Sequence, residues 1–368
     1  MAAPPHAVRA RHRHRGRDLG LPPPRSQGCG GTVLTRRASN APGVVVVTGA
    51  SAGVGRAVAH EFARRGAAVA LLARGEGGLA EVAKEVRALG GRALVIPTDV
   101  ADAGQVDAAA DQAEESLGPV DVWVNDAMAT IFAPVSEVHA DEFRRATEVT
   151  YLGTVYGTMA ALRLMRARDR GTVVQVGSAL AYRAIPLQSA YCGAKFAVRG
   201  FTDSVRTELL HDNSRVWITM VQLPAVNTPQ FSWGRTRLPD HPMPVPPIFQ
   251  PEVAARAVYW SATHRRRELI VGGSSLKAIR GTQLAPSLAD RYLARGGYRA
   301  QQIPGKPVRP DRPDNLFDPV PGVAATHGCF DSKATASSRE LWITTHRRLV
   351  VAGIAASAAA VVCAARNR

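Results

Sequence analysis

The chain has 368 residues, of which 46% are hydrophobic and 21% charged, and its formal net charge is +16. This length suits one α/β domain of about 250 residues with appendages, and the hydrophobic fraction suits a buried core. The charge is concentrated at the ends, because residues 1–43 carry +7 and residues 331–368 carry +4, which leaves +5 for the rest. Charged terminal segments without a recognition module argue against DNA or RNA as a partner.

The four cysteines are Cys29, Cys192, Cys329 and Cys363, and no two of them form a CxxC pair. This spacing excludes a zinc site of the usual structural kind and a small disulfide scaffold, so we predict no metal. No secretory signal opens the chain, and a reducing, cytoplasmic setting is therefore expected.

The pattern of apolar residues divides the chain. Residues 1–42 alternate His and Arg, contain a triple proline and lack apolar periodicity, which predicts a disordered basic tail. Residues 43–300 alternate short apolar runs with stretches of helical period, which predicts βαβ units in a doubly wound, Rossmann-type α/β domain with a seven-stranded parallel sheet. The predicted strands are 44–47, 67–72, 93–96, 120–124, 172–176, 216–221 and 269–271.

The C-terminal part differs in composition from the domain. Residues 301–340 are rich in proline and are predicted to form a linker. Residues 341–368 are predicted to form a hydrophobic helix, with an uncharged run at 349–365 that follows two arginines. The length of this run is at the lower limit for a membrane span, so two interpretations stay open: a C-terminal membrane anchor, and a buried or interfacial helix.

A glycine-rich turn, TGASAGVG at residues 48–55, joins the first predicted strand to the first helix. Glycines permit a tight turn and a close approach to a pyrophosphate, and the helix N-terminus attracts that anion. A structural turn is the alternative, but the position between strand and helix favours a dinucleotide. The candidate cofactor-binding residues of this loop are Thr48, Gly49, Ser51, Gly53, Val54 and Gly55.

The ends of the next two strands indicate which dinucleotide binds. An NAD-specific fold usually has Asp or Glu after the second strand, whereas this chain has Ala73 followed by Arg74. A guanidinium pairs with a 2′-phosphate, so Arg74 predicts a preference for NADP(H), with NAD as the alternative and a solvated loop residue as the competing interpretation. After the third strand, Asp99 and Val100 are candidates for contact with adenine, and Asp102 is better placed than Asp99 to cap the following helix.

The candidate catalytic residues follow the fifth predicted strand. Tyr191 and Lys195 are four residues apart in an amphipathic helix and therefore share a face. A nearby ammonium is expected to lower the pKa of the phenol toward the working pH, so that Tyr191 exchanges a proton with a carbonyl or an alcohol. Ser178 ends the strand, at the edge where open α/β sheets bind ligands, and is expected to hydrogen-bond the reacting oxygen. Each residue alone has a structural explanation, but together behind the glycine loop they predict a catalytic site.

These motifs resemble the short-chain dehydrogenase/reductase family over about residues 44–275, through the TGxxxGxG loop and the YxxxK motif. The resemblance implies NAD(P) as hydride carrier, oxidoreductase activity on an alcohol or carbonyl, and homo-oligomers. Further cofactor contacts that it implies are from Asn125, Ala127, Pro224 and Thr228, besides Tyr191 and Lys195.

Two positions depart from the family pattern. The family motif Asn-Asn-Ala-Gly reads Asn125-Asp126-Ala127-Met128 here, and Thr150 stands where an asparagine usually holds a water in the proton relay. Thr150 is therefore the fourth candidate catalytic residue, with a shorter reach than asparagine. These departures keep a second interpretation open, a non-catalytic NADP-binding scaffold or sensor on the same fold.

Residues 229–250 are expected to cover the substrate. Their apolar side chains are Phe231, Trp233, Leu238, Met243, Val245, Ile248 and Phe249. This composition suggests a small apolar alcohol or carbonyl, such as a lipid-like, steroid-like or aromatic one, although packing of the loop against its own domain explains the same residues.

Overall fold

A computed structural model of the chain describes residues 43–322, 324–347 and 349–353. The predicted N-terminal tail lies outside these residues, and so does most of the uncharged C-terminal run. Within the described residues, no helix combines the length and the apolarity that crossing a bilayer requires.

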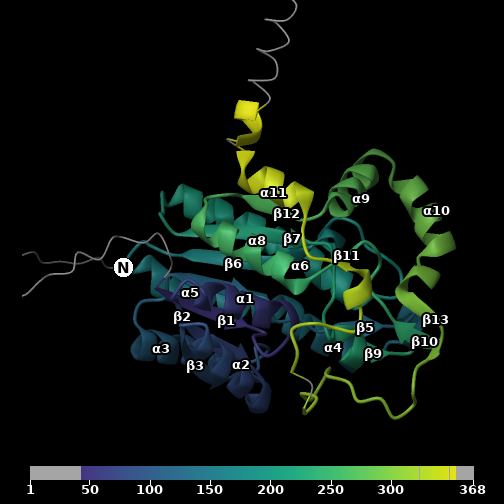
Figure 1. The fold of residues 1–368 in the computed structure, drawn as a ribbon, viewed down its shortest axis with the longest axis horizontal. Coiled ribbons are helices and arrows are strands. Elements are labelled where there is room, and N and C mark those ends of the chain that lie inside the picture. Colours follow the sequence, from purple (N-terminus) through teal and green to yellow (C-terminus); the bar gives the residue numbers. More distant parts are fainter. Residues whose placement is uncertain (1–42, 323, 348, 354–368) are drawn as a thin grey trace, which may run out of the picture. The chain divides into compact units, whose positions relative to one another are not determined.

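The centre of the domain is a seven-stranded parallel sheet with the strand order β12-β7-β6-β4-β1-β2-β3 (Figure 1). Its strands are β1 (Val44–Thr48), β2 (Ala68–Ala73), β3 (Arg92–Pro97), β4 (Val122–Asn125), β6 (Thr172–Ser178), β7 (Trp217–Leu223) and β12 (Glu268–Ile270). Each strand lies within two residues of the predicted bounds, so the predicted doubly wound sheet is confirmed.

Helices cover both faces of the sheet. The helices on one face are α1 (Gly53–Ala63), α2 (Glu76–Ala88) and α8 (Pro251–Thr263). The helices on the other face are α3 (Ala103–Leu117), α5 (Gly153–Arg166) and α6 (Ser189–His211). Along β1, Val45 and Val47 pack toward the first set, and Val44 and Val46 pack toward the second. Because both faces are buried, β1 is an uninterrupted apolar run rather than an alternating one.

Shorter elements complete the domain. Between β4 and α8 these are β5 (Ile131–Phe132), η1 (Val135–Glu137), α4 (Ala140–Thr147), the π-helical turn η2 (Glu148–Leu152), η3 (Ala179–Ala181), β8 (Ala225–Val226), α7 (Gln230–Trp233), β9 (Arg235–Thr236), β10 (Asp240–Pro242) and β11 (Ile248–Phe249). After β12 they are α9 (Gly273–Leu284), α10 (Pro286–Gly296), η4 (Arg299–Gln301), β13 (Gln302–Pro307), η5 (Asp331–Lys333), β14 (Ala334–Thr335) and α11 (Arg339–Thr345).

The segment that we predicted to be a linker, residues 301–340, packs against the domain. Strand β13 pairs with β10 and β14 pairs with β11. The side chains of Leu316 and Phe330 are 0% and 3% exposed. Single anchoring side chains in an irregular segment produce no periodicity, and for that reason the proline-rich sequence did not indicate this packing.

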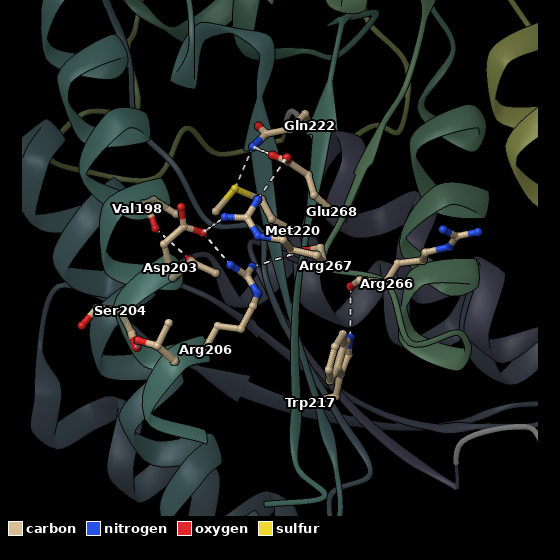
Figure 2. A network of polar contacts seen from close by, with 12 residues as sticks. Val198, Asp203, Ser204, Arg206, Trp217, Met220, Gln222, Arg266, Arg267 and Glu268 are labelled. Carbon is tan, nitrogen blue, oxygen red and sulfur yellow. Dashed lines mark hydrogen bonds and ion pairs between the residues drawn. The ribbon is translucent and has the colours of Figure 1, made fainter. Parts of the chain in front are cut away.

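A polar network fixes the long helix α6 to the edge of the sheet (Figure 2). The Asp203 carboxylate on α6 accepts hydrogen bonds from Arg206 at 2.5 Å and from Arg267 at 2.7 Å. Next to Arg267, the Glu268 carboxylate of β12 accepts a bond from the Gln222 amide at 2.6 Å. The network therefore positions the helix that carries Tyr191 and Lys195.

Candidate active site

One cavity of about 1650 Å³ runs along the carboxyl ends of the strands. Its wall includes residues of the turns after β1, β2, β3, β4, β6 and β7, together with parts of α9 and α10 and residues after β13. Open α/β sheets bind their ligands at this edge, because strand ends and helix N-termini converge there.

The glycine loop after β1 fits the phosphates of a dinucleotide. Gly49 and Gly53 adopt φ values of +70° and +55°, a region that favours glycine. A Cβ atom on Gly55 would lie 2.3 Å from the Gly49 carbonyl oxygen, so the turn can close only without a side chain there. Helix α1 begins at Gly53 and has no side-chain cap, and the Gly53 N–H donates to the Ala325 carbonyl at 2.9 Å, so the helix N-terminus is partly available to an anion.

The part of the wall next to Gly53 has an unsatisfied polar group. The Thr228 hydroxyl is buried and has no hydrogen-bond partner among the described residues, and Thr228 lines the cavity beside Pro224. Burial of an unpaired hydroxyl is costly, so a polar ligand group is expected beside it. The cavity, the glycine turn and this hydroxyl together fit a nicotinamide dinucleotide.

Most of the predicted cofactor residues line this cavity. They are Gly49, Ser51, Gly53, Val54, Arg74, Asp99, Val100, Ala127, Tyr191, Lys195, Pro224 and Thr228. Thr48, Gly55 and Asn125 lie behind the wall, although we predicted cofactor contacts for them as well.

Two of these residues build the wall from behind. The Thr48 hydroxyl accepts hydrogen bonds from the N–H groups of Asp126 and Ala127, at 3.0 and 3.1 Å. Asn125 accepts from the Trp123 indole at 2.9 Å and donates to the Gln175 side chain at 2.9 Å. Thr48 and Asn125 therefore hold the end of β4 in place through contacts that the sequence alone does not reveal.

The structure brings Ser178, Tyr191 and Lys195 together in the cavity wall. The Lys195 ammonium lies 5.6 Å from the centre of the Tyr191 ring and donates a hydrogen bond to the Val176 carbonyl at 2.7 Å. The Ser178 hydroxyl is hydrogen-bonded to the Tyr191 phenol and accepts a bond from the Leu180 N–H at 3.1 Å. A substrate oxygen at this position can meet both hydroxyl groups.

The protonation of Tyr191 differs from what we expected. Tyr191 faces the cavity but lies deep in the protein, and this desolvation raises the pKa of its phenol above the usual value, while the Ser178 hydrogen bond opposes the shift. Burial also lowers the pKa of Lys195, to about 8. The predicted lowering of the Tyr191 pKa is therefore wrong, because desolvation has the largest effect on the phenol.

Asp126 is a site residue that the sequence analysis did not assign. Burial raises the pKa of its carboxyl to about 7, against the opposing effects of Lys195 and of a hydrogen bond from the Gly55 N–H. Asp126 lines the cavity, so its carboxylate and the Lys195 ammonium share one environment. The signal in the sequence was the departure from Asn-Asn-Ala-Gly, which we used only to keep the scaffold interpretation open.

Thr150 is placed away from the other three candidate catalytic residues. It lies in the π-helical turn η2, is fully buried, and is not part of the cavity wall. Its hydroxyl donates to the Ala129 carbonyl at 3.1 Å and accepts from the Ala129 N–H at 2.9 Å. The only proton of this hydroxyl is therefore used in fixing the segment after β4.

The two polar residues at the adenine end have partners within the protein. The Arg74 guanidinium lines the cavity and donates hydrogen bonds to three main-chain carbonyls of residues 315–317. Asp99 forms an ion pair with Arg145 at 2.5 Å. The competing role, capping of α3, belongs to Asp102 as predicted, since its carboxylate accepts from the Gln105 N–H at 3.1 Å.

The comparisons with known proteins agree with this geometry. The family model for short chain dehydrogenases matches residues 43–236, which is more than half of the chain. The chain belongs to this family. This short-chain dehydrogenase is thus an oxidoreductase of the class that acts on CH–OH groups with NAD(P).

Individual relatives add detail. An uncharacterized oxidoreductase, YxnA of Bacillus subtilis, is 31% identical over 327 residues, which cover 87% of this chain and 91% of the relative. A 3-dehydrosphinganine reductase of Danio rerio is 37% identical over 193 residues, which cover 51% of this chain and 58% of the relative.

Two solved structures share the fold. One is an alcohol dehydrogenase from the archaeon Thermococcus sibiricus complexed with 5-hydroxy-NADP, with a TM-score of 0.55 and 28% identity over 62% of this chain and 95% of that one. The other is a metagenomic short-chain oxidoreductase in complex with NADP, with a TM-score of 0.53 and 26% identity over 62% of this chain and 96% of that one.

The segment expected to cover the substrate of this short-chain dehydrogenase divides its side chains between two roles. Phe231, Leu238 and Ile248 are buried in an apolar cluster with Phe330, so they pack within the domain. The apolar side chains of this segment that line the cavity include Trp233, Met243 and Val245, and α10 adds Leu288 and Tyr292. Phe231 does both, because it belongs to the buried cluster and also lines the cavity.

Proposed function

We propose that this short-chain dehydrogenase is an NADP(H)-dependent oxidoreductase that interconverts an alcohol and a ketone or aldehyde. The observation that carries the proposal is the convergence of Ser178, Tyr191 and Lys195 in the wall of the cavity that also contains the glycine loop. A scaffold without turnover has no need of three polar side chains at one point of a cavity.

The roles of the three residues follow from their contacts. The Ser178 and Tyr191 hydroxyls bind the oxygen of the substrate, and the dinucleotide supplies or accepts the hydride when it is bound. Tyr191 donates a proton to that oxygen during reduction, and the Lys195 ammonium stabilises the phenolate that remains. Burial raises the pKa of Tyr191, so the phenol carries the proton that reduction of a carbonyl transfers to the substrate oxygen.

The preference for NADP(H) is supported by two observations. Arg74 lies in the cavity wall at the end of β2, next to Ala73 rather than to a carboxylate that would repel a 2′-phosphate. Both solved relatives described above were determined with NADP or with a derivative of it.

For the substrate we propose an apolar carbonyl compound of the keto-lipid type. The outer part of the cavity is lined by apolar side chains of Trp233, Met243, Leu288 and Tyr292, which suit an aliphatic or aromatic chain. The similarity to a 3-dehydrosphinganine reductase, although it covers about half of this chain, points to the same chemical class.

Two further proposals concern association. Exposed apolar side chains on α5 and α6, namely Met159 (61% exposed), Phe196 (43%) and Leu210 (61%), support a homo-oligomer. Association with a membrane through residues 349–365, in a protein that is otherwise cytoplasmic, is supported by sequence alone. Ultracentrifugation and a flotation assay test these two points.

The main experiment is a screen of ketones, aldehydes and alcohols with NADPH and NADH, which measures turnover of the nicotinamide. Tyr191→Phe is expected to lower kcat by about 10²- to 10⁴-fold and to change the Kd for NADPH far less than kcat. Tyr182→Phe is the matched control, because that phenol bonds Glu268 and is not part of the cavity wall. Binding of NADPH without turnover of any compound in the screen, and no effect of Tyr191→Phe on any rate, would favour the scaffold interpretation.

A further inference from the structure

A segment near the C-terminus forms one wall of the cavity. We define the C-terminal strap as residues 314–322 and 324–330, which lie beyond the match to the family model. In Figure 1 the yellow-green chain after β13 returns toward the side of the sheet where α1 and α2 begin. The strap residues that line the cavity are Asn315, Pro319, Val320, Pro321, Gly322 and Ala324.

The strap is fixed at its first end by Asp314 and Leu316. The Asp314 carboxylate accepts a hydrogen bond from the Arg235 guanidinium at 2.9 Å and another from the Leu316 N–H at 3.0 Å. The Leu316 side chain is 0% exposed and belongs to the core between the sheet and α3. This end therefore has both a polar and an apolar anchor.

The strap is fixed at its second end by Phe330. The Phe330 ring is 3% exposed and lies 5.9 Å from the Phe231 ring in an edge-on arrangement. Its N–H group donates to the Asn227 side chain at 3.1 Å. Between the two anchors, the described residues of the strap include those that line the cavity.

The strap holds the Arg74 guanidinium. Arg74 donates to the carbonyl oxygens of Asn315 at 2.5 Å, Leu316 at 3.3 Å and Phe317 at 2.5 Å. Arg145 donates to the Leu316 carbonyl as well, at 3.3 Å. A guanidinium has five N–H donors, so the three bonds leave two donors of Arg74 without a partner among the described residues.

The strap also reaches the phosphate end of the site. The Ala325 carbonyl accepts a hydrogen bond from the Gly53 N–H at 2.9 Å, and the Ala324 carbonyl accepts one from the Arg56 guanidinium at 2.6 Å. Gly78 permits this approach, because a Cβ atom there would lie 3.2 Å from the Cβ atom of Ala324. The strap thus spans the site from Arg74 to the glycine loop.

We propose that the C-terminal strap determines the preference for NADP(H) over NAD(H), because its carbonyls hold the Arg74 guanidinium in position for a 2′-phosphate. A long side chain that is already immobilised loses little conformational entropy when it binds, so more of the interaction energy appears as affinity. Only NADP(H), which carries a 2′-phosphate, gains affinity from the immobilised Arg74 side chain. The inference rests on the proposed function, and it assigns cofactor selectivity to a segment outside the matched family region.

Deleting the strap would also remove the buried side chains of Leu316 and Phe330 from the core, so the test uses a milder change. Asp314→Asn keeps the size of the side chain and removes the ion pair with Arg235. The control is Glu114→Gln, which removes an ion pair with Arg168 of the same length as the Asp314–Arg235 pair, 2.9 Å. Like Asp314, the Glu114 carboxylate also accepts a hydrogen bond from a main-chain N–H, that of Val120. Glu114 is on α3 and is not part of the cavity wall.

The measurement is the Kd of the full-length protein for NADP⁺ and for NAD⁺ by calorimetry. We expect Asp314→Asn to lower the ratio of the two affinities by roughly fivefold, with NAD⁺ affected less than about twofold, because one charge-assisted contact to the phosphate loses its alignment. Glu114→Gln is expected to leave the ratio unchanged. In an Arg74→Ala background, Asp314→Asn is expected to have no further effect on the ratio.

The outcomes of this experiment distinguish a failure of the strap proposal from a failure of the proposed function. An unchanged ratio in Asp314→Asn overturns the proposal, even if both affinities fall together. A higher preference for NADP⁺ also overturns it, because the strap would then compete with the 2′-phosphate for Arg74. Failure of the wild-type protein to bind either dinucleotide instead contradicts the proposed function, so the two failures are distinguishable.

Discussion

The pair of Asp126 and Lys195 yields a prediction about the pH dependence of catalysis. Asp126→Asn keeps the shape of the side chain, restores the residue of the family motif and removes a negative charge. The groups that face Asp126 are Lys195 and Tyr191 on α6 and the Gly55 N–H on α1. With the carboxylate removed, the buried ammonium loses the attraction that opposes its desolvation, so the pKa of Lys195 falls.

The magnitude follows from the pKa of the wild-type lysine. That pKa is about 8 with the carboxylate in place. An opposite charge at close range typically changes a pKa by about 1–3 units, and one unit corresponds to about 1.4 kcal/mol. We therefore expect the pKa of Lys195 in the variant to lie about one to two units lower, which near pH 7.5 removes between about two-thirds and nearly all of the protonated lysine.

The assay measures kcat for carbonyl reduction at saturating NADPH between about pH 5.5 and 9.5. This pH range brackets the pKa values of Asp126 and Lys195, about 7 and about 8. Activity requires the ammonium, so the rate falls as the pH rises through the pKa of Lys195, and this alkaline limb is expected to move to lower pH in Asp126→Asn. The control is Asp121→Asn at the other end of β4, where the carboxylate accepts from the Gly43 N–H at 2.8 Å. An alkaline limb at the same pH in wild type and Asp126→Asn would refute the reasoning.

Three other predictions concern stability and binding. Glu142 accepts bonds from two arginines, which lower its pKa from 4.5 to about 2. Its contribution to the free energy of unfolding, about 3 kcal/mol, is therefore present above about pH 4.5 and lost toward pH 2. Urea titrations at pH 7 and pH 3 are expected to show a larger loss of stability in wild type than in Glu142→Gln, whose remaining loss comes from other carboxylates with lowered pKa values, such as Glu85. Thr150→Val leaves the Ala129 N–H and C=O unpaired and is expected to cost about 1–3 kcal/mol of stability with little change in kcat; a loss of kcat above about 100-fold in folded protein would instead place the hydroxyl in the proton relay. Gly55→Ala forces a Cβ atom against the Gly49 carbonyl and is expected to abolish NADPH binding in calorimetry, whereas Gly200→Ala, with open space around its Cβ, is expected to bind normally.

Local patterns in the sequence determined the architecture and the spacing of the candidate catalytic pair. The strands of the sheet are buried on both faces, so each produced a continuous apolar run that could be located within two residues. Tyr191 and Lys195 share a face because a helix repeats every 3.6 residues, and this relation needs no knowledge of the rest of the fold. The glycine loop is likewise a local requirement of backbone geometry.

The tertiary structure alone decided the electrostatics and the partners of the site. The sequence could not show that desolvation would raise the pKa of Tyr191, because burial depends on all the elements packed around it. Nor could it show that Thr150 bonds Ala129, or that Arg74 bonds carbonyls 241 to 243 residues away. The segment that holds Arg74 has no periodicity, and its position depends on two isolated side chains, Leu316 and Phe330, that are buried by distant parts of the chain. Spacing along the chain predicts contacts within one element, whereas contacts between distant segments depend on how the elements pack.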